Sequence, residues 1–220
     1  MATRIAVIGS GNVGGNLGAR LSKSGFPVHF GVRDAKGNDE LLARCAKDAA
    51  AVPVAEAAQW AEVVFLAVPA AAAVEVAKGL AAQLEGKIVV DCNNPLVWKE
   101  GPVWTPPAEG SLAAAIAKVV PGARVVKAFN TFGAEFHADP LHAGAPAAQV
   151  YMAGDDAAAK QALAEIAAEA GFRTVDSGPL RNAALVENLA ILWIHLATVG
   201  GHGRNFVFAM QGKPAAGLPL

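Results

Sequence analysis

The chain has 220 residues, with 18 Lys and Arg against 19 Asp and Glu, and its formal net charge is −1 at pH 7. This balance argues against a protein that binds nucleic acid or a membrane surface, because either partner favours a basic excess. The length suffices for one globular unit whose core needs no disulfide or metal. Alanine is unusually abundant, so the apolar pattern must be interpreted together with the residues that interrupt it.

The first part of the chain alternates short apolar strands with helices. We expect strands over residues 4–8, 28–32, 52–54, 61–68 and 87–91, and helices over residues 12–24, 41–51, 56–60 and 70–84. The strands are apolar almost throughout, which is typical of strands covered on both faces. Alternation at this spacing predicts right-handed crossovers and a mainly parallel sheet.

Residues 93–110 interrupt the alternation with four prolines, two glycines and two tryptophans, and predict an ordered loop or lid. The alternation then resumes with helices over 112–120 and 156–170, strands over 124–128, 149–153 and 172–176, and a long helix over 180–199. That last helix contains Glu187, Asn188 and His195, so it is expected to be a core or dimer-interface helix and not a membrane span. The whole pattern predicts an α/β fold: a Rossmann-like, doubly wound domain over residues 1–178, with a small C-terminal helix and tail over 179–220.

A glycine-rich loop joins the first strand to the first helix. It consists of Gly9, Ser10, Gly11, Asn12, Val13 and Gly14. In this G-x-G-x-x-G pattern the first glycine permits a tight turn, the second lets a pyrophosphate approach the backbone, and the third lets the helix pack closely. The free N–H groups at the helix start would bind the phosphate charge. We therefore expect a dinucleotide-binding site.

The end of the second strand indicates which dinucleotide binds. Binders of NAD usually have a carboxylate about 20 residues after the glycines, whereas this chain has Arg33 at that distance from Gly11. A guanidinium there can pair with a 2′-phosphate and stack on adenine, and Lys36 could add a second positive charge. The alternative is that Arg33 is a solvated turn residue and Asp34 binds the ribose. The pattern favours NADP(H).

The nicotinamide is expected beyond the carboxyl ends of the strands, where ligands bind in open α/β sheets. The residues at those ends are Ala67, Val68, Pro69, Asn93, Asn94, Ala128 and Asn130. Val68 and Pro69 would supply an apolar wall, and Asn130 a partner for the carboxamide. The sequence identifies no catalytic group; Asn130 is a candidate for that role. Asn93 and Asn94 are equally typical of a turn before a proline.

A general acid for carbonyl reduction is not evident. The chain has no Tyr-x-x-x-Lys or Ser-x-x-x-Lys pair, and its one tyrosine, Tyr151, falls in an expected strand. Hydride transfer to a flavin-like ring needs less acid–base help, because the ring spreads the charge. Phe206 and Phe208 could form a second wall for such a ring, or could simply pack as a terminal strand.

The five histidines and two cysteines show no paired spacing that would predict a metal site. Two widely separated cysteines, Cys45 and Cys92, suit a reducing cytoplasm, and the first apolar run is too short for a secretory signal. We therefore expect a cytoplasmic protein without a metal, nucleic acid or membrane partner.

The chain resembles the NADP oxidoreductases that use the deazaflavin coenzyme F420. The resemblance extends over nearly the whole chain and rests on Gly9–Gly14, Gly31–Arg33, Val68–Pro69, Val125–Ala128 with Thr131, Gly154–Asp156, Asp176–Leu180 and Leu185–Leu189. It implies a homodimeric Rossmann-fold enzyme that transfers a hydride reversibly between NADPH and the deazaflavin without a metal. Asn130 and Ala184 stand where the deazaflavin reductases have histidine and arginine, so a flavin, a quinone or another small electrophile also stays open as acceptor.

Three functions follow from these observations. The first is hydride transfer between NADP(H) and a flavin-like or deazaflavin co-substrate. The second is a redox sensor that binds NADP(H) without turnover. The third is reduction of an imine or small carbonyl, for which Asn130 or a water would deliver the proton.

Overall fold

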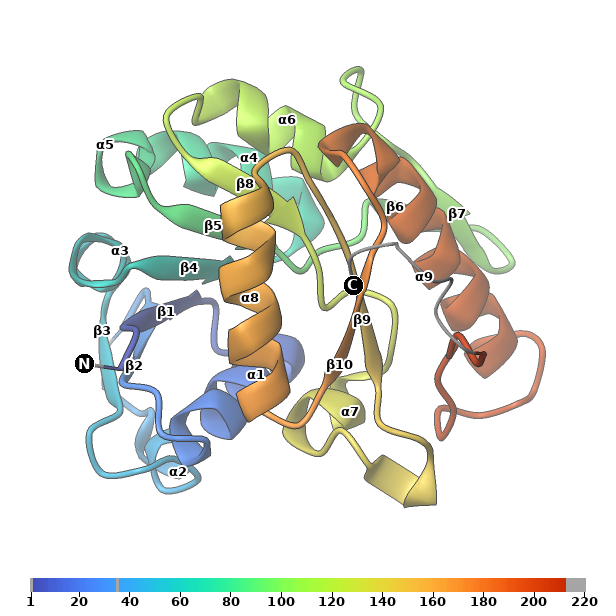
Figure 1. Ribbon diagram of the computed structural model, residues 1–220, viewed down its shortest axis with the longest axis horizontal. Coiled ribbons are helices and arrows are strands. Elements are labelled where there is room, and N and C mark those ends of the chain that lie inside the picture. Colours follow the sequence, from blue (N-terminus) through green and yellow to red (C-terminus); the bar gives the residue numbers. More distant parts are fainter. Residues whose placement is uncertain (1, 35, 213–220) are drawn as a thin grey trace.

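The fold is built around one large sheet, in a computed structural model that describes residues 2–34 and 36–212 (Figure 1). Its strand order is β10-β9-β8-β5-β4-β1-β2-β3. The strands are β1 (Ile5–Ile8), β2 (Val28–Val32), β3 (Ala50–Pro53), β4 (Val63–Leu66), β5 (Ile88–Asp91), β8 (Arg124–Lys127), β9 (Gln149–Gly154) and β10 (Arg173–Asp176). Neighbours pair in parallel except β8 and β9, which are antiparallel. The mainly parallel sheet predicted from the sequence is confirmed.

Helices cover both faces of this sheet. They are α1 (Asn12–Lys23), α2 (Asp39–Leu42), α3 (Val54–Trp60), α4 (Ala70–Gly79), α5 (Ala81–Leu84), α6 (Leu112–Val119), α7 (Ala134–Ala138), α8 (Ala157–Glu169) and α9 (Ala183–Thr198). In β1, Ile5 and Val7 pack on the side of α1 and α8, whereas Ala6 and Ile8 pack on the side of α3, α4 and α6. Every residue of β1 is therefore buried, which explains the continuous apolar runs.

The prediction of a helix over residues 41–51 is wrong. Only α2, a single turn, forms there, and Ala50 and Ala51 belong to β3. Ala50 pairs with His29 at the edge of the sheet, and this backbone ladder outweighs the helix propensity of an alanine-rich segment. The helix expected over 70–84 is likewise divided at Leu80 into α4 and α5.

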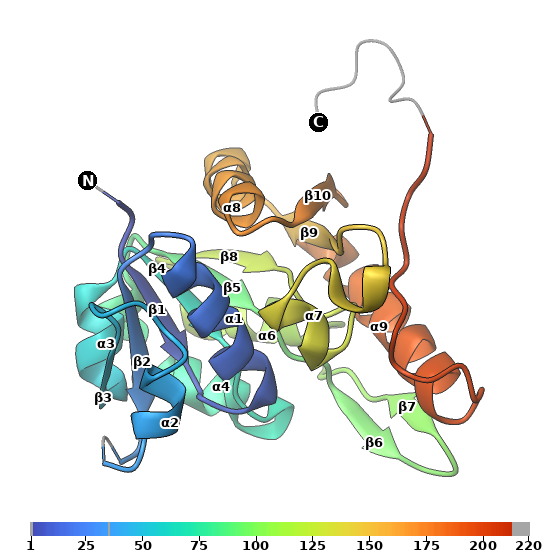
Figure 2. The same ribbon diagram turned by 90° about the horizontal axis from the view of Figure 1, so that it is seen from below.

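The expected loop over residues 93–110 contains a β-hairpin of β6 (Leu96–Trp98) and β7 (Pro102–Trp104). Figure 2 shows the hairpin extending away from the main sheet, beside the lower part of α9. The turn between its strands includes Glu100 at φ 46°. The segment is thus ordered, as expected, but by its own pair of strands.

The C-terminal part begins with a short 3₁₀ turn, Leu180–Asn182, followed by α9. The tail beyond it forms no strand over the described residues, so that alternative for Phe206 and Phe208 is wrong. The indole Nε1 of Trp193 donates to the Phe206 carbonyl at 2.9 Å, so the tail packs on α9. Residues 213–220 of the proposed part 179–220 lie outside the described residues, and the division at 178 stays a prediction. No helix over the described ranges is long and apolar enough to span a membrane.

Candidate functional site

Two hollows flank the glycine loop at the carboxyl ends of the strands. The first, of about 370 Å³, is lined by Gly11, Asn12, Val13, Ala67, Val68, Pro69, Ala70, Cys92, Asn93 and Asn94. The second, of about 460 Å³, is lined by Ser10, Val32, Arg33, Asp34, Lys36 and Asn38. The fold therefore gathers most of the residues singled out in the sequence along one edge of the sheet, where open α/β sheets bind ligands.

The glycine loop is shaped by close backbone contacts. Gly9 has φ +104°, and a Cβ there would lie 2.4 Å from the Ala67 carbonyl oxygen. A Cβ on Gly14 would lie 2.0 Å from the Gly9 carbonyl oxygen, so the loop closes on itself. Around Gly11 there is open space, with no atom within 4 Å of a built Cβ. Gly11 is the N-cap of α1 and no side chain caps this helix end, so its N–H groups face the first hollow without a competitor.

The second hollow contains the positive groups expected at the end of β2. Arg33 and Lys36 are exposed, and among the described residues Arg33 has no hydrogen-bond or ion-pair partner. One carboxylate oxygen of Asp34, Oδ1, accepts from the Lys36 backbone N–H at 2.9 Å. Asn38 Nδ2 donates to the Asp34 carbonyl at 2.9 Å and stabilises the same turn. The guanidinium is thus available to an anionic ligand, while Asp34 is partly committed to the turn.

The first hollow combines an apolar wall with amide groups. Val68 and Pro69 lie at the end of β4, and Asn93 and Asn94 follow β5. Sequence reasoning missed Cys92, which also lines this hollow. Burial raises the pKa of the Cys92 thiol far above its usual range, and the neighbouring Asp91 carboxylate adds to the effect, so the thiol is neutral.

Ala128 and Asn130 lie behind this hollow and are not among its lining residues. Ala128 is fully buried, and Asn130 is 6% exposed. Asn130 Nδ2 donates to Asn94 Oδ1 at 2.9 Å and to the Val186 carbonyl at 3.3 Å. Its Oδ1 is buried without a partner among the described residues. Asn130 thus joins the end of β8 to α9.

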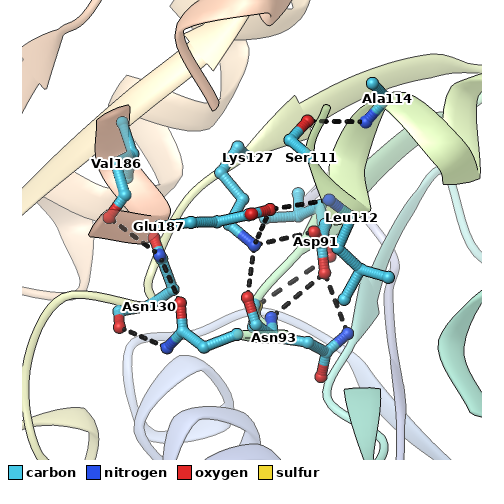
Figure 3. Close-up of polar contacts among 12 residues, drawn as sticks. Asp91, Asn93, Ser111, Leu112, Ala114, Lys127, Asn130, Val186 and Glu187 are labelled. Carbon is cyan, nitrogen blue, oxygen red and sulfur yellow. Dashed lines mark hydrogen bonds and ion pairs between the residues drawn. The ribbon is translucent and has the colours of Figure 1, made fainter. Parts of the chain in front are cut away.

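A cluster of buried charged side chains lies next to the side-chain amide of Asn93 (Figure 3). Lys127, Asp91 and Glu187 each have fully buried side chains. Lys127 Nζ lies 2.8 Å from Asp91 Oδ2 and 3.3 Å from Glu187 Oε1, and it also donates to the Asn93 carbonyl. We call these three charged side chains the buried triad. Among the described residues no group of His, Cys, Asp and Glu could hold a metal ion.

The triad joins elements far apart in the sequence. Glu187 Oε1 accepts from the Leu112 backbone N–H at the start of α6, and its Oε2 accepts from Trp104 Nε1 in β7, both at 2.9 Å. None of the three triad residues was predicted from the sequence to belong to the site. The available signal was a lysine in an otherwise apolar strand, an aspartate at the end of another and a glutamate in an apolar helix, because buried charges require partners.

Comparison with known proteins identifies the family. Residues 4–95 match the family model described as NADP oxidoreductase, coenzyme F420-dependent. The F420-dependent NADP reductase of Methanothermobacter thermautotrophicus is 31% identical over 215 residues, which cover 89% of this chain and 90% of that relative. The chain belongs to this family. The resemblance seen in the sequence is confirmed, and with it the expectation of an NADP-dependent oxidoreductase.

Two further proteins are similar to this chain. A structure from Arthrobacter sp. FB24, provisionally named an F420-dependent NADP reductase, has a TM-score of 0.84 and 31% identity and covers 96% of this chain and 100% of its own. Metalloreductase STEAP3 of Rattus norvegicus is 33% identical over 191 residues, 86% of this chain. The chain spans only 37% of the length of STEAP3. The Rossmann-like fold and its C-terminal helix are thus shared over the full length of one solved relative.

Proposed function

We propose that the protein transfers a hydride between NADP(H), bound along the two hollows, and the deazaflavin F420. The observation that carries the proposal is the placement of a glycine loop between a cationic hollow and an apolar, amide-lined hollow. NADPH, when bound, supplies the hydride, and the acceptor takes it with one proton. Both cysteines are free, which supports a reducing compartment such as the cytoplasm.

The residues present fit NADP(H). The open space at Gly11 and the uncapped start of α1 suit a pyrophosphate. In the second hollow the exposed guanidinium of Arg33 and the ammonium of Lys36 would bind the 2′-phosphate, with Ser10 beside them. Gly9 and Gly14 would act by shaping the loop.

In the first hollow the proposed contacts are apolar and amide groups. Val68 and Pro69, with Asn12, Val13 and Ala67 nearby, would exclude water from one face of the nicotinamide, and Asn93 would bind its carboxamide. Ala128 and Asn130 would support this wall from behind. The acceptor would then approach from the side of α9 and the hairpin. F420 is favoured among acceptors by the relatives that carry its name.

The test follows NADPH oxidation by absorbance with purified protein and a panel of F420, FMN, a quinone and a cyclic imine. Turnover with F420 alone, or at least a hundredfold faster than with the others, is the expected result. Preferred turnover of the quinone, FMN or imine would overturn F420 as the acceptor, whereas NADPH would remain the nucleotide. Tight NADPH binding without turnover of any acceptor would indicate a redox sensor instead of an enzyme.

We also propose that two copies associate through the outer face of α9. Leu185 and Leu192 of this helix and Val199, its C-cap residue, recur every seven residues and are 68%, 48% and 48% exposed. Trp98 and Val103 of the hairpin are 58% and 40% exposed, and β7 contacts α9. Light scattering should give a dimer for the wild type and a monomer for Leu192→Arg. The same change at Leu141, an exposed leucine on another surface, should leave the dimer intact.

A further inference from the structure

The proposed contacts with the nucleotide leave the buried triad without a role. Burying one ammonium and two carboxylates is expensive unless each charge is paired and hydrogen-bonded. Here every carboxylate oxygen of Asp91 and Glu187 has a hydrogen-bond or ion-pair partner. The Lys127 ammonium donates to Asp91 Oδ2 and to the Asn93 carbonyl, and it forms an ion pair with Glu187 Oε1 at 3.3 Å. Such a complete set of partners holds its members in one arrangement.

The residue held most tightly by this arrangement is Asn93, which lines the first hollow. Its backbone N–H and its side-chain Nδ2 both donate to Asp91 Oδ1, at 3.0 and 2.8 Å. Its carbonyl accepts from Lys127. The backbone and one amide N–H of Asn93 are therefore occupied, while its amide oxygen Oδ1 accepts no hydrogen bond from a described residue. Figure 3 shows this side chain linked to Asp91 through its nitrogen only.

We infer that Lys127 is a positioning residue: through Asp91 and the Asn93 carbonyl it fixes the Asn93 amide so that Oδ1 accepts a hydrogen bond from the N–H of a primary carboxamide. This inference rests on the proposed function, since it names the ligand group recognised in the first hollow. With one amide N–H held by Asp91, Oδ1 keeps a fixed place, and a ligand without N–H would leave this oxygen unpaired, so the site favours a carboxamide over an equally sized group without N–H. Glu187 connects this arrangement to α9 and β7, because it lies on α9 and binds both Lys127 and Trp104.

The experiment measures dissociation constants by calorimetry for three ligands. NADP⁺ has the carboxamide, its 3-acetylpyridine analogue has an acetyl group without N–H, and 2′,5′-ADP lacks the nicotinamide half. The wild type should bind NADP⁺ about tenfold more tightly than the acetyl analogue, as expected for one hydrogen bond. Lys127→Met should reduce this ratio to about one and leave the affinity for 2′,5′-ADP unchanged.

Lys118→Met is the matched control. Lys118 pairs with Glu109 at 2.7 Å, a contact as short as that of Lys127 with Asp91, but its side chain is 70% exposed. This variant should retain the full preference for NADP⁺. A general loss of stability would weaken all three ligands together and would not change their ratios, so the ratio separates positioning from a merely structural role.

A double-mutant cycle tests whether Lys127 acts through Asn93. Asn93→Ala should abolish the preference for the carboxamide, and adding Lys127→Met should reduce it no further. Should Lys127→Met not fold because Glu187 loses its buried cation, the combination of Lys127→Met with Glu187→Gln, which removes one positive and one negative charge, replaces it in the cycle and should lower the preference while leaving 2′,5′-ADP binding intact.

Two results would overturn the inference alone: an unchanged preference in the triad variant, or losses that add in the double variant. A wild type that binds neither NADP⁺ nor 2′,5′-ADP would instead overturn the proposed function. The two failures are thus distinguishable.

Discussion

Asn94 and Asn130 bind each other twice across the ends of β5 and β8. Asn130 Nδ2 donates to Asn94 Oδ1, and Asn94 Nδ2 donates to the Asn130 carbonyl, both at 2.9 Å. The pair also reaches α9, because Asn130 Nδ2 lies 3.3 Å from the Val186 carbonyl. A residue that the sequence offered as a carboxamide partner therefore joins three elements behind the hollow.

Replacing Asn130 should expose this role. Asn130→Ala should lower the free energy of unfolding by about 1–3 kcal/mol, because it leaves buried partners unsatisfied. Asn130→Asp should lower it further at neutral pH, since a carboxylate would face the acceptor oxygens of Asn94 and Val186. Urea denaturation measures both. Gln161→Ala, exposed on α8, is the control, and an Asp variant as stable as the wild type would contradict the geometry.

Replacement by alanine should have different effects on stability and on NADPH binding at two glycines of the loop. Gly14→Ala should destabilise the fold by about 1–3 kcal/mol, because its Cβ would overlap the Gly9 carbonyl. Gly11→Ala should cost at most about 1 kcal/mol, the disadvantage of alanine at an N-cap, since Gly11 has φ −70° and open space around it. It should nevertheless weaken NADPH binding at least tenfold, because the methyl group would occupy the space left for the pyrophosphate.

Thermal melts and calorimetry separate the two glycine effects. A Gly11→Ala protein that binds NADPH like the wild type would place the pyrophosphate elsewhere.

Arg33 should decide the preference for NADPH over NADH. Arg33→Ala should lower that preference roughly 10- to 100-fold, the effect of one or two charge-assisted hydrogen bonds to a phosphate. The affinity for NADH should stay nearly constant, because NADH has no 2′-phosphate. Binding titrations with both nucleotides measure the ratio, and Arg173→Ala, exposed on β10, is the control. An unchanged ratio would favour Asp34 as the ribose partner.

His137 should make stability depend on pH. Burial lowers the pKa of His137 below its usual value, although the carbonyls of Phe129 and Gly133, at 2.8 and 3.1 Å from its ring nitrogens, act in the opposite direction. The unfolded chain then binds more protons than the folded one below about pH 6.5, so stability should fall as the pH drops through that range.

Urea midpoints at pH 7.5 and 5.5 test this linkage. His137→Gln should show a smaller difference between the two values than the wild type. Part of the difference should persist, since burial also lowers the pKa of His29. His202→Gln changes an exposed histidine and should behave like the wild type. An equal difference in all three proteins would exclude His137 as the source.

The sequence by itself determined the glycine loop, the doubly wound sheet and the family. These features depend on short-range patterns: apolar runs of strand length, glycines at fixed spacing, and helices ended by residues such as Gly25, which has φ +95°. Each can be recognised within a few neighbouring residues, so no knowledge of distant contacts is needed.

Only the tertiary structure decided which polar residues meet. The segment 41–51 has helix propensity, but pairing beside β2 placed its end in an edge strand. The triad joins Asp91, Lys127 and Glu187 from two strands and a helix, and none of them has its charged partner near it in the sequence. A buried charge shows that a partner must exist, but the strand order and helix packing determine which residue it is.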